Sequence, residues 1–210
     1  MTHRTILALD LGTTTGWALR DLAGKLGKKV EFVTQGEATE LDKGLVEKIT
    51  ALYGDDLSGL RFALWGLSFK PNTDDVREAP SRVLVRELTQ RGAHVRAYDP
   101  VAGQAACEAL KTDLGLKVFS TQFELVDEPY EALQGCAALL IATEWKAFRS
   151  PDFERMKRML RDQRIFDGRN MYEPEVMRQH GMDYHGIGRM ARAEEGAHTY
   201  SPSAADLLRV

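Results

Sequence analysis

The sequence predicts a doubly wound α/β domain, in which helices cover both faces of a mainly parallel sheet of five or six strands. From about residue 60 onward, short apolar runs alternate with amphipathic segments of helical length, as expected for strands connected by helices. Prolines open several of the amphipathic segments, where the first turn of a helix accepts them. The 210 residues, 43% hydrophobic and 28% charged, suffice for one main core of ordinary globular composition.

The expected elements alternate along the chain in the order strand, helix, strand, which is the Rossmann-like arrangement. Pro80, Pro129 and Pro151 should lie in the first turns of their helices, and Gly92 suits the left-handed residue that ends the first of these helices. Strands are expected at residues 62–67, 94–98, 117–120, 137–142, 164–166 and 182–185. Helices are expected at residues 80–91, 102–111, 129–134, 151–161 and 173–179.

Two further segments flank this pattern. Before the first strand, Leu45, Ile49 and Leu52 share one face of an amphipathic segment that predicts another helix. The last residues mix Ala, Glu, Gly, Ser and Pro without periodicity and predict a flexible tail. The expected division is a short β-hairpin or meander at 1–40, a linking helix at 41–58, the α/β domain at 59–190 and the tail at 191–210.

The N-terminal segment carries a different pattern, with Asp10 in the middle of a strand, a Gly/Thr turn and a second strand. This segment resembles the opening hairpin of ribonuclease H-like folds, including RuvC-type junction nucleases and actin-like sugar kinases. In such nucleases the aspartate holds a divalent metal, but two-metal chemistry needs several carboxylates from distant strands. Because the rest of the chain offers no such partners, we interpret the segment as a fused remnant and expect no metal site.

Charge and cysteine content exclude several classes of function. A net charge of −3 and a pI near 6.0 give no basic surface for nucleic acid. The early apolar run is too short for a membrane span and lacks the features of a signal peptide, so we expect a cytoplasmic protein without membrane contact. Cys107 and Cys136 have no metal-binding spacing, and we interpret both as buried hydrophobic residues.

Ligands of open α/β sheets bind outside the carboxyl ends of the strands, so the segments after the apolar runs are the candidate sites. After the first run, Lys70 precedes a polar loop and a helix N-terminus, an arrangement that suits a phosphate. A solvated loop lysine is the structural alternative. The loop contains neither a dinucleotide-binding GxGxxG sequence nor a P-loop.

Two other strand ends carry polar residues. Asp167 and Arg169 follow a strand, and the arginine suits either a pyrophosphate or an ion pair with a neighbouring carboxylate. Thr143, Glu144 and Trp145 follow another strand, and Trp145 is interpreted as core in preference to a stacking surface for a ligand.

Several segments in this order resemble the UDP-binding C-terminal domain of the UDP-glucose/GDP-mannose dehydrogenase family. The resemblance covers about residues 45–190 and rests on several motifs that agree in order and spacing. These motifs are FALWGLSFKPNTDD and REAPS at 62–81, VRAYDP at 95–100, ATEW at 142–145, IFDGRN at 165–170 and YHGIGR at 184–189.

This resemblance implies the oxidation of UDP-glucose to UDP-glucuronate in two NAD-dependent steps through a cysteine thiohemiacetal. By the same resemblance, Phe69 and Lys70 belong to the nucleotide-sugar loop, with Lys70 toward the diphosphate, and Arg169 helps to hold the UDP-sugar. Other residues expected to line the site are Thr143, Glu144, Trp145 and Asp167. Dehydrogenases of GDP-mannose and of UDP-N-acetyl sugars are close alternatives.

The chain also departs from the family pattern. It contains neither the NAD-binding domain with its GxGxxG turn nor the helical domain with the Gly-Gly-x-Cys nucleophile segment. We therefore expect binding of UDP-glucose or UDP without a bound cofactor, no catalytic residue, and no activity of the chain alone. The alternatives are an oligomerisation or interaction module, paired with itself or with another dehydrogenase chain, and a ribonuclease H-like nuclease centred on Asp10.

Overall fold

The computed structural model describes residues 38–187. Asp10 and the tail expected at 191–210 lie outside the described residues, as does the β segment expected at 1–40 except for residues 38–40, which begin a helix. The described residues form a sheet of six parallel strands, as predicted. The strands are β1 (Arg61–Trp65), β2 (His94–Tyr98), β3 (Phe123–Leu125), β4 (Ala138–Ile141), β5 (Arg164–Asp167) and β6 (Asp183–Gly186).

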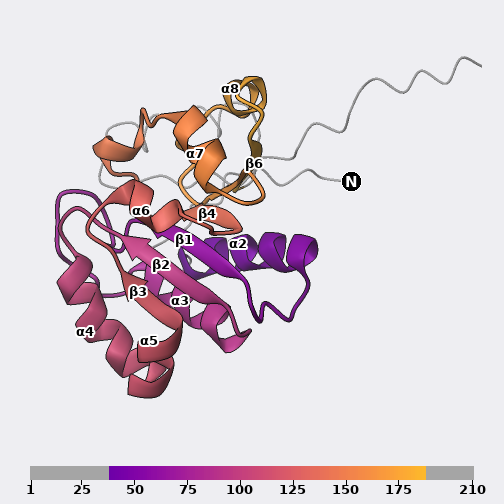
Figure 1. Ribbon diagram of the computed structural model, residues 1–210. Helices are drawn as coiled ribbons and strands as arrows, with labels where there is room; N and C mark the ends of the chain where they lie inside the picture. The colour runs from indigo at the N-terminus through magenta and orange to yellow at the C-terminus, as the bar shows by residue number, and fades with distance from the viewer. Residues whose placement is uncertain (1–37, 188–210) are drawn as a thin grey trace, which may run out of the picture.

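The strand order is β3-β2-β1-β4-β5-β6, so the first strand lies in the middle of the sheet (Figure 1). β2 and β3 extend the sheet on one side of β1, and the chain then crosses over to add β4, β5 and β6 on the other side. In register, β1 pairs with β2 through Phe62 and Val95, and with β4 through Leu64 and Leu140. The reversal between β1 and β4 creates the switch point at which open α/β sheets bind ligands.

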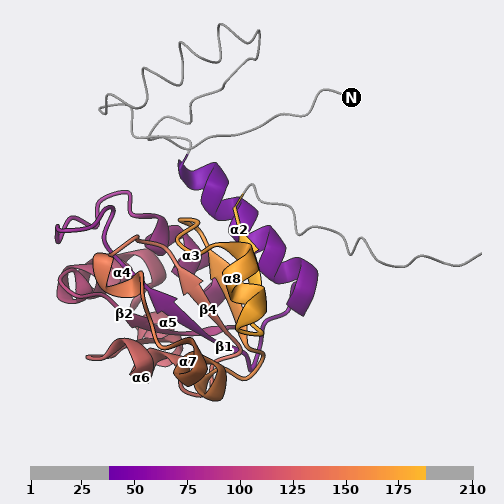
Figure 2. The same ribbon diagram turned by 90° about the horizontal axis from the view of Figure 1, so that it is seen from above.

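Helices cover both faces of the sheet, and each face has its own hydrophobic core. Figure 2 shows α2 and α3 on one side of the strands and α6 and α7 on the other. The helices packed on the first face are α2 (Ala38–Tyr53), α3 (Pro80–Gln90) and α4 (Gly103–Leu114), and the short α5 (Leu116–Gln122) lies beside β3. The second face carries α6 (Pro129–Leu133), the 3-10 helix η2 (Lys146–Phe148), α7 (Phe153–Met159) and α8 (Pro174–Gln179).

Helix α2 is part of the core of the sheet domain. Leu45 and Ile49 are buried against the first face, as the amphipathic pattern predicts. The prediction is wrong for Leu52, which is 46% exposed. Tyr53 packs inward in its place, with its ring 5.4 Å from that of Phe62 in an edge-on arrangement.

The prediction of a strand at 117–120 is wrong. Those residues belong to α5, and the strand comes directly afterwards as β3. The two phenylalanines of this segment explain the difference: Phe119 in the helix stacks on Phe123 at the start of the strand, with ring centroids 5.3 Å apart. A spacing of four residues brings side chains together on a helix, whereas in a strand it would separate them by about 13 Å.

Helix ends follow the expected chemistry with one correction. Pro80 and Pro129 occupy first turns as predicted, but Pro151 lies outside its helix, which begins after Asp152. The Asp152 side chain caps α7 by accepting a hydrogen bond from the backbone N–H of Arg155 at 2.9 Å. Gly92 has φ 88°. The backbone amides of Gly92 and Ala93 donate hydrogen bonds to carbonyls of α3, which forms the predicted left-handed helix end.

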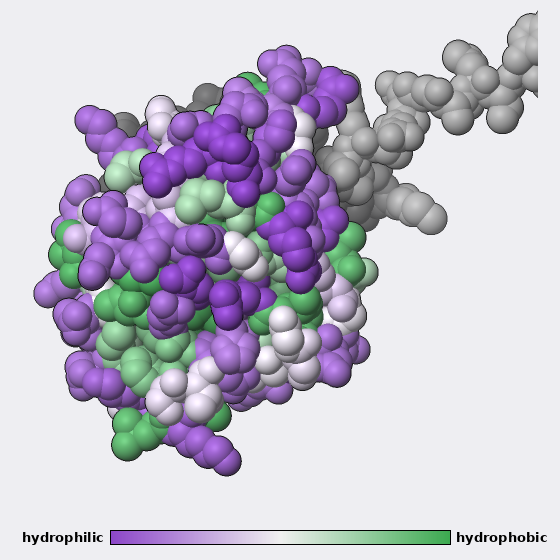
Figure 3. Space-filling model, in the orientation of Figure 1, coloured by the Kyte–Doolittle hydropathy of each residue, from purple (hydrophilic) through white to green (hydrophobic). Residues whose placement is uncertain are grey.

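The surface over these elements is of mixed polarity. On the side shown in Figure 3, hydrophilic residues predominate and hydrophobic residues appear as separate patches between them. Within residues 38–187, no helix has the length and the apolar character that a membrane span requires.

Candidate functional site

The loops that follow the strands gather at one edge of the sheet. We call this the carboxyl edge and define it as residues 66–70, 99–102, 142–145 and 167–172. Because β1, β4 and β5 are consecutive neighbours in the sheet, the candidate residues after these strands all lie along it. The structure therefore places the predicted site residues on one edge, contributed by three separate loops.

The Asp99 carboxylate holds the centre of this edge together. It follows β2, is 8% exposed, and its contacts come from the loops after β1, β2 and β4. Oδ2 accepts hydrogen bonds from the amides of Leu67 at 2.7 Å and Ser68 at 3.1 Å and from the indole of Trp145 at 3.1 Å, and Oδ1 accepts from the amides of Val101 at 2.9 Å and Ala102 at 2.7 Å.

Gly66 and Thr143 bring the ends of β1 and β4 into direct contact. Gly66 has φ 91°, and a Cβ atom there would lie 2.5 Å from the Cβ of Thr143. The Thr143 hydroxyl donates a hydrogen bond of 2.6 Å to the carbonyl of Ser68. Thr143 is 0% exposed, so its side chain supports the loop from below.

Phe69 and Lys70 begin the loop that connects β1 to α3. Phe69 is half-buried against the first core, and its amide donates to the carbonyl of Asp75 at 2.8 Å. Lys70 is exposed. The backbone at Phe69 is thus anchored, while the cation beside it reaches solvent.

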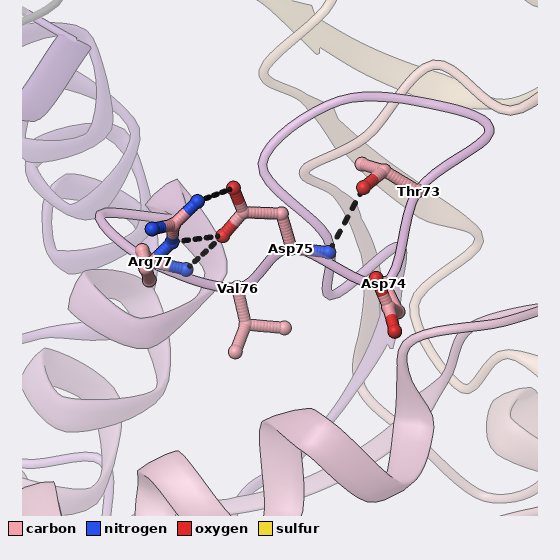
Figure 4. A pocket seen from close by; sticks show the side chains of 5 residues that line it. All are labelled: Thr73, Asp74, Asp75, Val76 and Arg77. Carbon is pink, nitrogen blue, oxygen red and sulfur yellow. Dashed lines mark hydrogen bonds and ion pairs between the residues drawn. The ribbon is translucent and has the colours of Figure 1, made fainter.

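The rest of this loop borders a shallow, open depression of about 440 Å³, lined by Thr73, Asp74, Asp75, Val76 and Arg77 (Figure 4). Arg77 donates to both oxygens of Asp75, at 2.9 and 2.8 Å. These bonds, and that from the Arg77 amide, lower the pKa of the Asp75 carboxyl to about 2, with a small contribution from Lys70. Arg77 thus neutralises Asp75, while Lys70 carries no ion pair within the described residues.

Arg169 lies two residues after β5 and reaches back to β4. Its Nε donates to the carbonyl of Ala142 at 2.7 Å and lies 3.3 Å from a carboxylate oxygen of Glu144. Its side chain is 20% exposed, and within residues 38–187 its Nη groups have no hydrogen bond. The guanidinium is held by Nε, and its two outer nitrogens are without a hydrogen bond among the described residues.

Asp167 shapes the turn that carries Arg169. Its carboxylate is 0% exposed and accepts hydrogen bonds from the amides of Arg169 at 2.8 Å and Met171 at 2.7 Å, and from the hydroxyl of Tyr184 at 2.8 Å. Burial raises the pKa of Asp167, and these hydrogen bonds oppose that effect. Asp167 therefore faces its own loop.

Trp145 and the two cysteines are packing residues, as predicted for the tryptophan and for Cys136. Trp145 is 7% exposed and belongs to the second core. Cys136 is 0% exposed, its thiol donates to the carbonyl of Ala132, and burial raises its pKa to about 11. Cys107 is half-buried, and burial raises its pKa as well. Neither thiol has the low pKa of a nucleophile.

Three supporting residues were not identified as functional from the sequence. These are Asp99, Gly66 and Ser81, whose buried hydroxyl donates to the carbonyl of Leu67 at 2.7 Å. The position of Asp99 directly after a strand is a usable signal, because that is where loops of the carboxyl edge begin. The partners of its carboxylate come from segments about 30 and 46 residues away, which no local pattern reveals.

Sequence comparison connects this domain to a known family. The sequence model of the UDP-glucose/GDP-mannose dehydrogenase family, UDP binding domain, matches residues 63–174. UDP-glucose 6-dehydrogenase of Pseudomonas aeruginosa is 43% identical over 145 residues, which are 69% of this chain and 31% of that relative. The chain thus spans about a third of the length of the curated relatives that it matches.

Solved structures agree with the sequence match. A UDP-glucose dehydrogenase from Pyrobaculum islandicum aligns with a TM-score of 0.55 and 28% identity over 72% of this chain and 30% of its own. A UDP-D-ManNAc dehydrogenase from Pyrococcus horikoshii aligns with a TM-score of 0.54 and 26% identity over 73% of this chain and 31% of its own.

Proposed function

Because the chain belongs to the UDP-glucose/GDP-mannose dehydrogenase family, of which it contains the UDP binding domain, we propose that its carboxyl edge binds a UDP-sugar. The observation that carries this proposal is the family match over residues 63–174, which includes the loops after β1, β4 and β5. That match favours binding of a UDP-sugar over an oligomerisation module without a ligand and over a nuclease.

The proposed contacts are electrostatic and come from two sides of the edge. Within the part of the chain that the structure describes, Lys70 provides an unpaired cation on the loop after β1, and Arg169 provides two unbonded Nη groups on the loop after β5. We propose that both bind the diphosphate, since an arginine fork matches two phosphate oxygens and a lysine ammonium acts as a mobile point charge. Phe69, half-buried beside Lys70, offers an apolar contact to the uridine.

The remaining candidates have supporting roles in this proposal. Thr143 holds the Ser68 carbonyl, and Asp167 shapes the turn of Arg169. Glu144 is 40% exposed and pairs with Arg169, so a bound phosphate would compete with its carboxylate for the guanidinium. Trp145 contributes by packing beneath the edge.

We propose UDP-glucose as the nucleotide sugar, because the relative from Pseudomonas aeruginosa, 43% identical to this chain, is a UDP-glucose 6-dehydrogenase. The match is confined to the UDP binding domain, so binding, and not oxidation, is the activity proposed for this chain. A hydride transfer needs a nicotinamide held against the substrate. In this proposal NAD and the reacting thiol belong to other parts of the full family architecture.

Isothermal titration calorimetry of the 210-residue chain tests the proposal. UDP and UDP-glucose should bind with similar affinity, because the contacts are made to the nucleotide part. Inorganic pyrophosphate, which lacks the uridine, should bind at least tenfold more weakly. Equal affinity for pyrophosphate would reduce the site to a general anion site, and absence of UDP binding would refute the proposal.

A further inference from the structure

The amides of the turn after β1 have an unusual partner. In dinucleotide-binding domains of this topology, the turn after the first strand is left open for a pyrophosphate, and an acidic residue after the second strand binds the ribose. Here Asp99 is the acidic residue after β2, but its carboxylate points into the domain and accepts the amides of Leu67 and Ser68. The turn is therefore already satisfied by the protein itself.

The Asp99 carboxylate occupies a position inside the fold where several N–H groups converge, as they would around a bound anion. Both oxygens receive N–H donors, with bond lengths from 2.7 to 3.1 Å, and the hydroxyl of Ser68 lies 3.4 Å from Oδ2. Five amide or indole donors around a carboxylate that is 8% exposed form a preorganised anion cradle. Without the carboxylate, four of these donors, the amides of Leu67, Ser68 and Ala102 and the indole of Trp145, would be buried without acceptors, which is costly.

We infer that Asp99 is a positioning residue for the nucleotide-sugar site: its carboxylate acts as an internal anion that fixes the loop carrying Phe69 and Lys70. Two consequences follow from this position, and both rest on the function proposed above. The loop is shaped before a ligand arrives, since Leu67 and Ser68 immediately precede Phe69. The side chains of Lys70 and Arg169 then recognise the phosphates, because the amides of Leu67, Ser68 and Phe69 already have acceptors within the protein.

Chemical rescue tests this role without any nucleotide. Asp99→Ala retains Cβ and removes only the carboxylate, so formate can replace the missing group. We expect Asp99→Ala to lower Tm by about 10 °C, as the loss of one partner from a buried network does. Formate at about tenfold its Kd should then raise Tm by about 3 °C more than chloride at the same ionic strength.

The matched control is Asp162→Ala. Asp162 also accepts hydrogen bonds, from Tyr53 at 2.8 Å and from Arg161, but it lies before β5 at the opposite end of the sheet. Formate should not stabilise this variant or the wild type beyond the effect of chloride. An equal gain in all three proteins, or no gain in Asp99→Ala, would overturn the inference.

The link to the ligand site is tested by UDP affinity. In Asp99→Ala, UDP binding should fall at least tenfold and recover with formate, an effect that simple destabilisation does not produce.

If Asp99→Ala does not fold, Asp99→Asn keeps the shape but turns an acceptor into a donor, and it should weaken UDP binding by a similar factor. Wild-type affinity in a folded Asp99→Asn would overturn the inference. If the wild type itself fails to bind UDP, the proposed function fails, while the formate experiment still decides the role of Asp99.

Discussion

Gly66, the residue at which β1 leaves the sheet, has both a left-handed backbone and a close neighbour. Its φ is 91°, and Thr143 lies 2.5 Å from the position that a Cβ atom would take. Gly66→Ala therefore combines a backbone penalty of about 1–2 kcal/mol with overpacking of about 1–3 kcal/mol. Urea unfolding should show a loss of about 2–5 kcal/mol.

Gly54 separates the two contributions to this loss. It has φ 87°, but no atom lies within 4 Å of the position that its Cβ would take. Gly54→Ala should cost only the backbone penalty of about 1–2 kcal/mol. Equal losses in the two variants would mean that the contact between Gly66 and Thr143 is not tight.

Lys70 and Arg169 are the residues on which the proposed binding depends. A charge-assisted hydrogen bond contributes about 1.5–3 kcal/mol, so Lys70→Ala or Arg169→Ala should weaken UDP binding about ten- to a hundredfold. Lys117→Ala and Arg178→Ala are matched controls, because these two cations lie on α5 and α8 and should leave the affinity unchanged. If the controls and the site variants behave alike in calorimetry, the nucleotide binds elsewhere.

Tyr53 connects helix α2 to the loop that leads into strand β5. Its hydroxyl donates to Asp162 at 2.8 Å, and burial, followed by this hydrogen bond, raises the pKa of Tyr53 to about 12. Since the pKa is higher in the folded than in the unfolded chain, the associated stability is present below pH about 10 and is lost as the pH rises through about 12.

Tyr53→Phe should therefore lose about 1 kcal/mol near neutral pH, the usual net contribution of one hydrogen bond. The difference between wild type and variant should shrink as the pH rises above about 10, because only the wild type has this hydroxyl to ionise. Urea unfolding across this pH range measures it. A difference that stays constant to high pH would show that Tyr53 does not titrate as described.

At the level of whole elements, most of the sheet could be predicted from the sequence. Strands that are buried on both faces, such as β4 and residues 62–65 of β1, are unbroken apolar runs, and this pattern predicts their positions. The prediction of a strand around Phe119 was wrong because a short apolar run does not distinguish a helix from a strand. The prediction that Pro151 lies in the first turn of its helix was wrong because Asp152, one residue later, provides the helix cap.

In the candidate site, too, some features could be predicted from the sequence and others could not. The positions of Lys70 and Arg169 on the carboxyl edge could be predicted, because both residues follow buried strands and the carboxyl ends of parallel strands share one edge. Their role in binding stays a prediction. Asp99 and Gly66 could not be assigned their roles. Those roles consist of contacts with Trp145 and Thr143, which only the folded sheet brings near.

At the level of the whole molecule, we propose that the domain recognises a nucleotide sugar and does not oxidise it. The purified chain with UDP-glucose and NAD should produce no NADH, since hydride transfer needs a nicotinamide held against the substrate, which this proposal assigns to other parts of the family architecture. Cys136 is also fully buried, and burial raises the pKa of both thiols. The UDP-glucose 6-dehydrogenase of Pseudomonas aeruginosa is a suitable positive control in the same spectrophotometric assay. NADH formation that Cys107→Ser or Cys136→Ser abolishes would assign a catalytic thiol to this chain.

The central claim, that the nucleotide binds at the carboxyl edge, is tested most directly by titrating the isotopically labelled chain with UDP and following its amide chemical shifts. We expect the largest shifts at Phe69, Lys70 and Arg169. The opposite end of the sheet has a cavity of about 280 Å³, lined in part by Arg61 and His94, which is the alternative location that the titration would reveal. Shifts concentrated around that cavity, with the carboxyl edge unchanged, would contradict the claim.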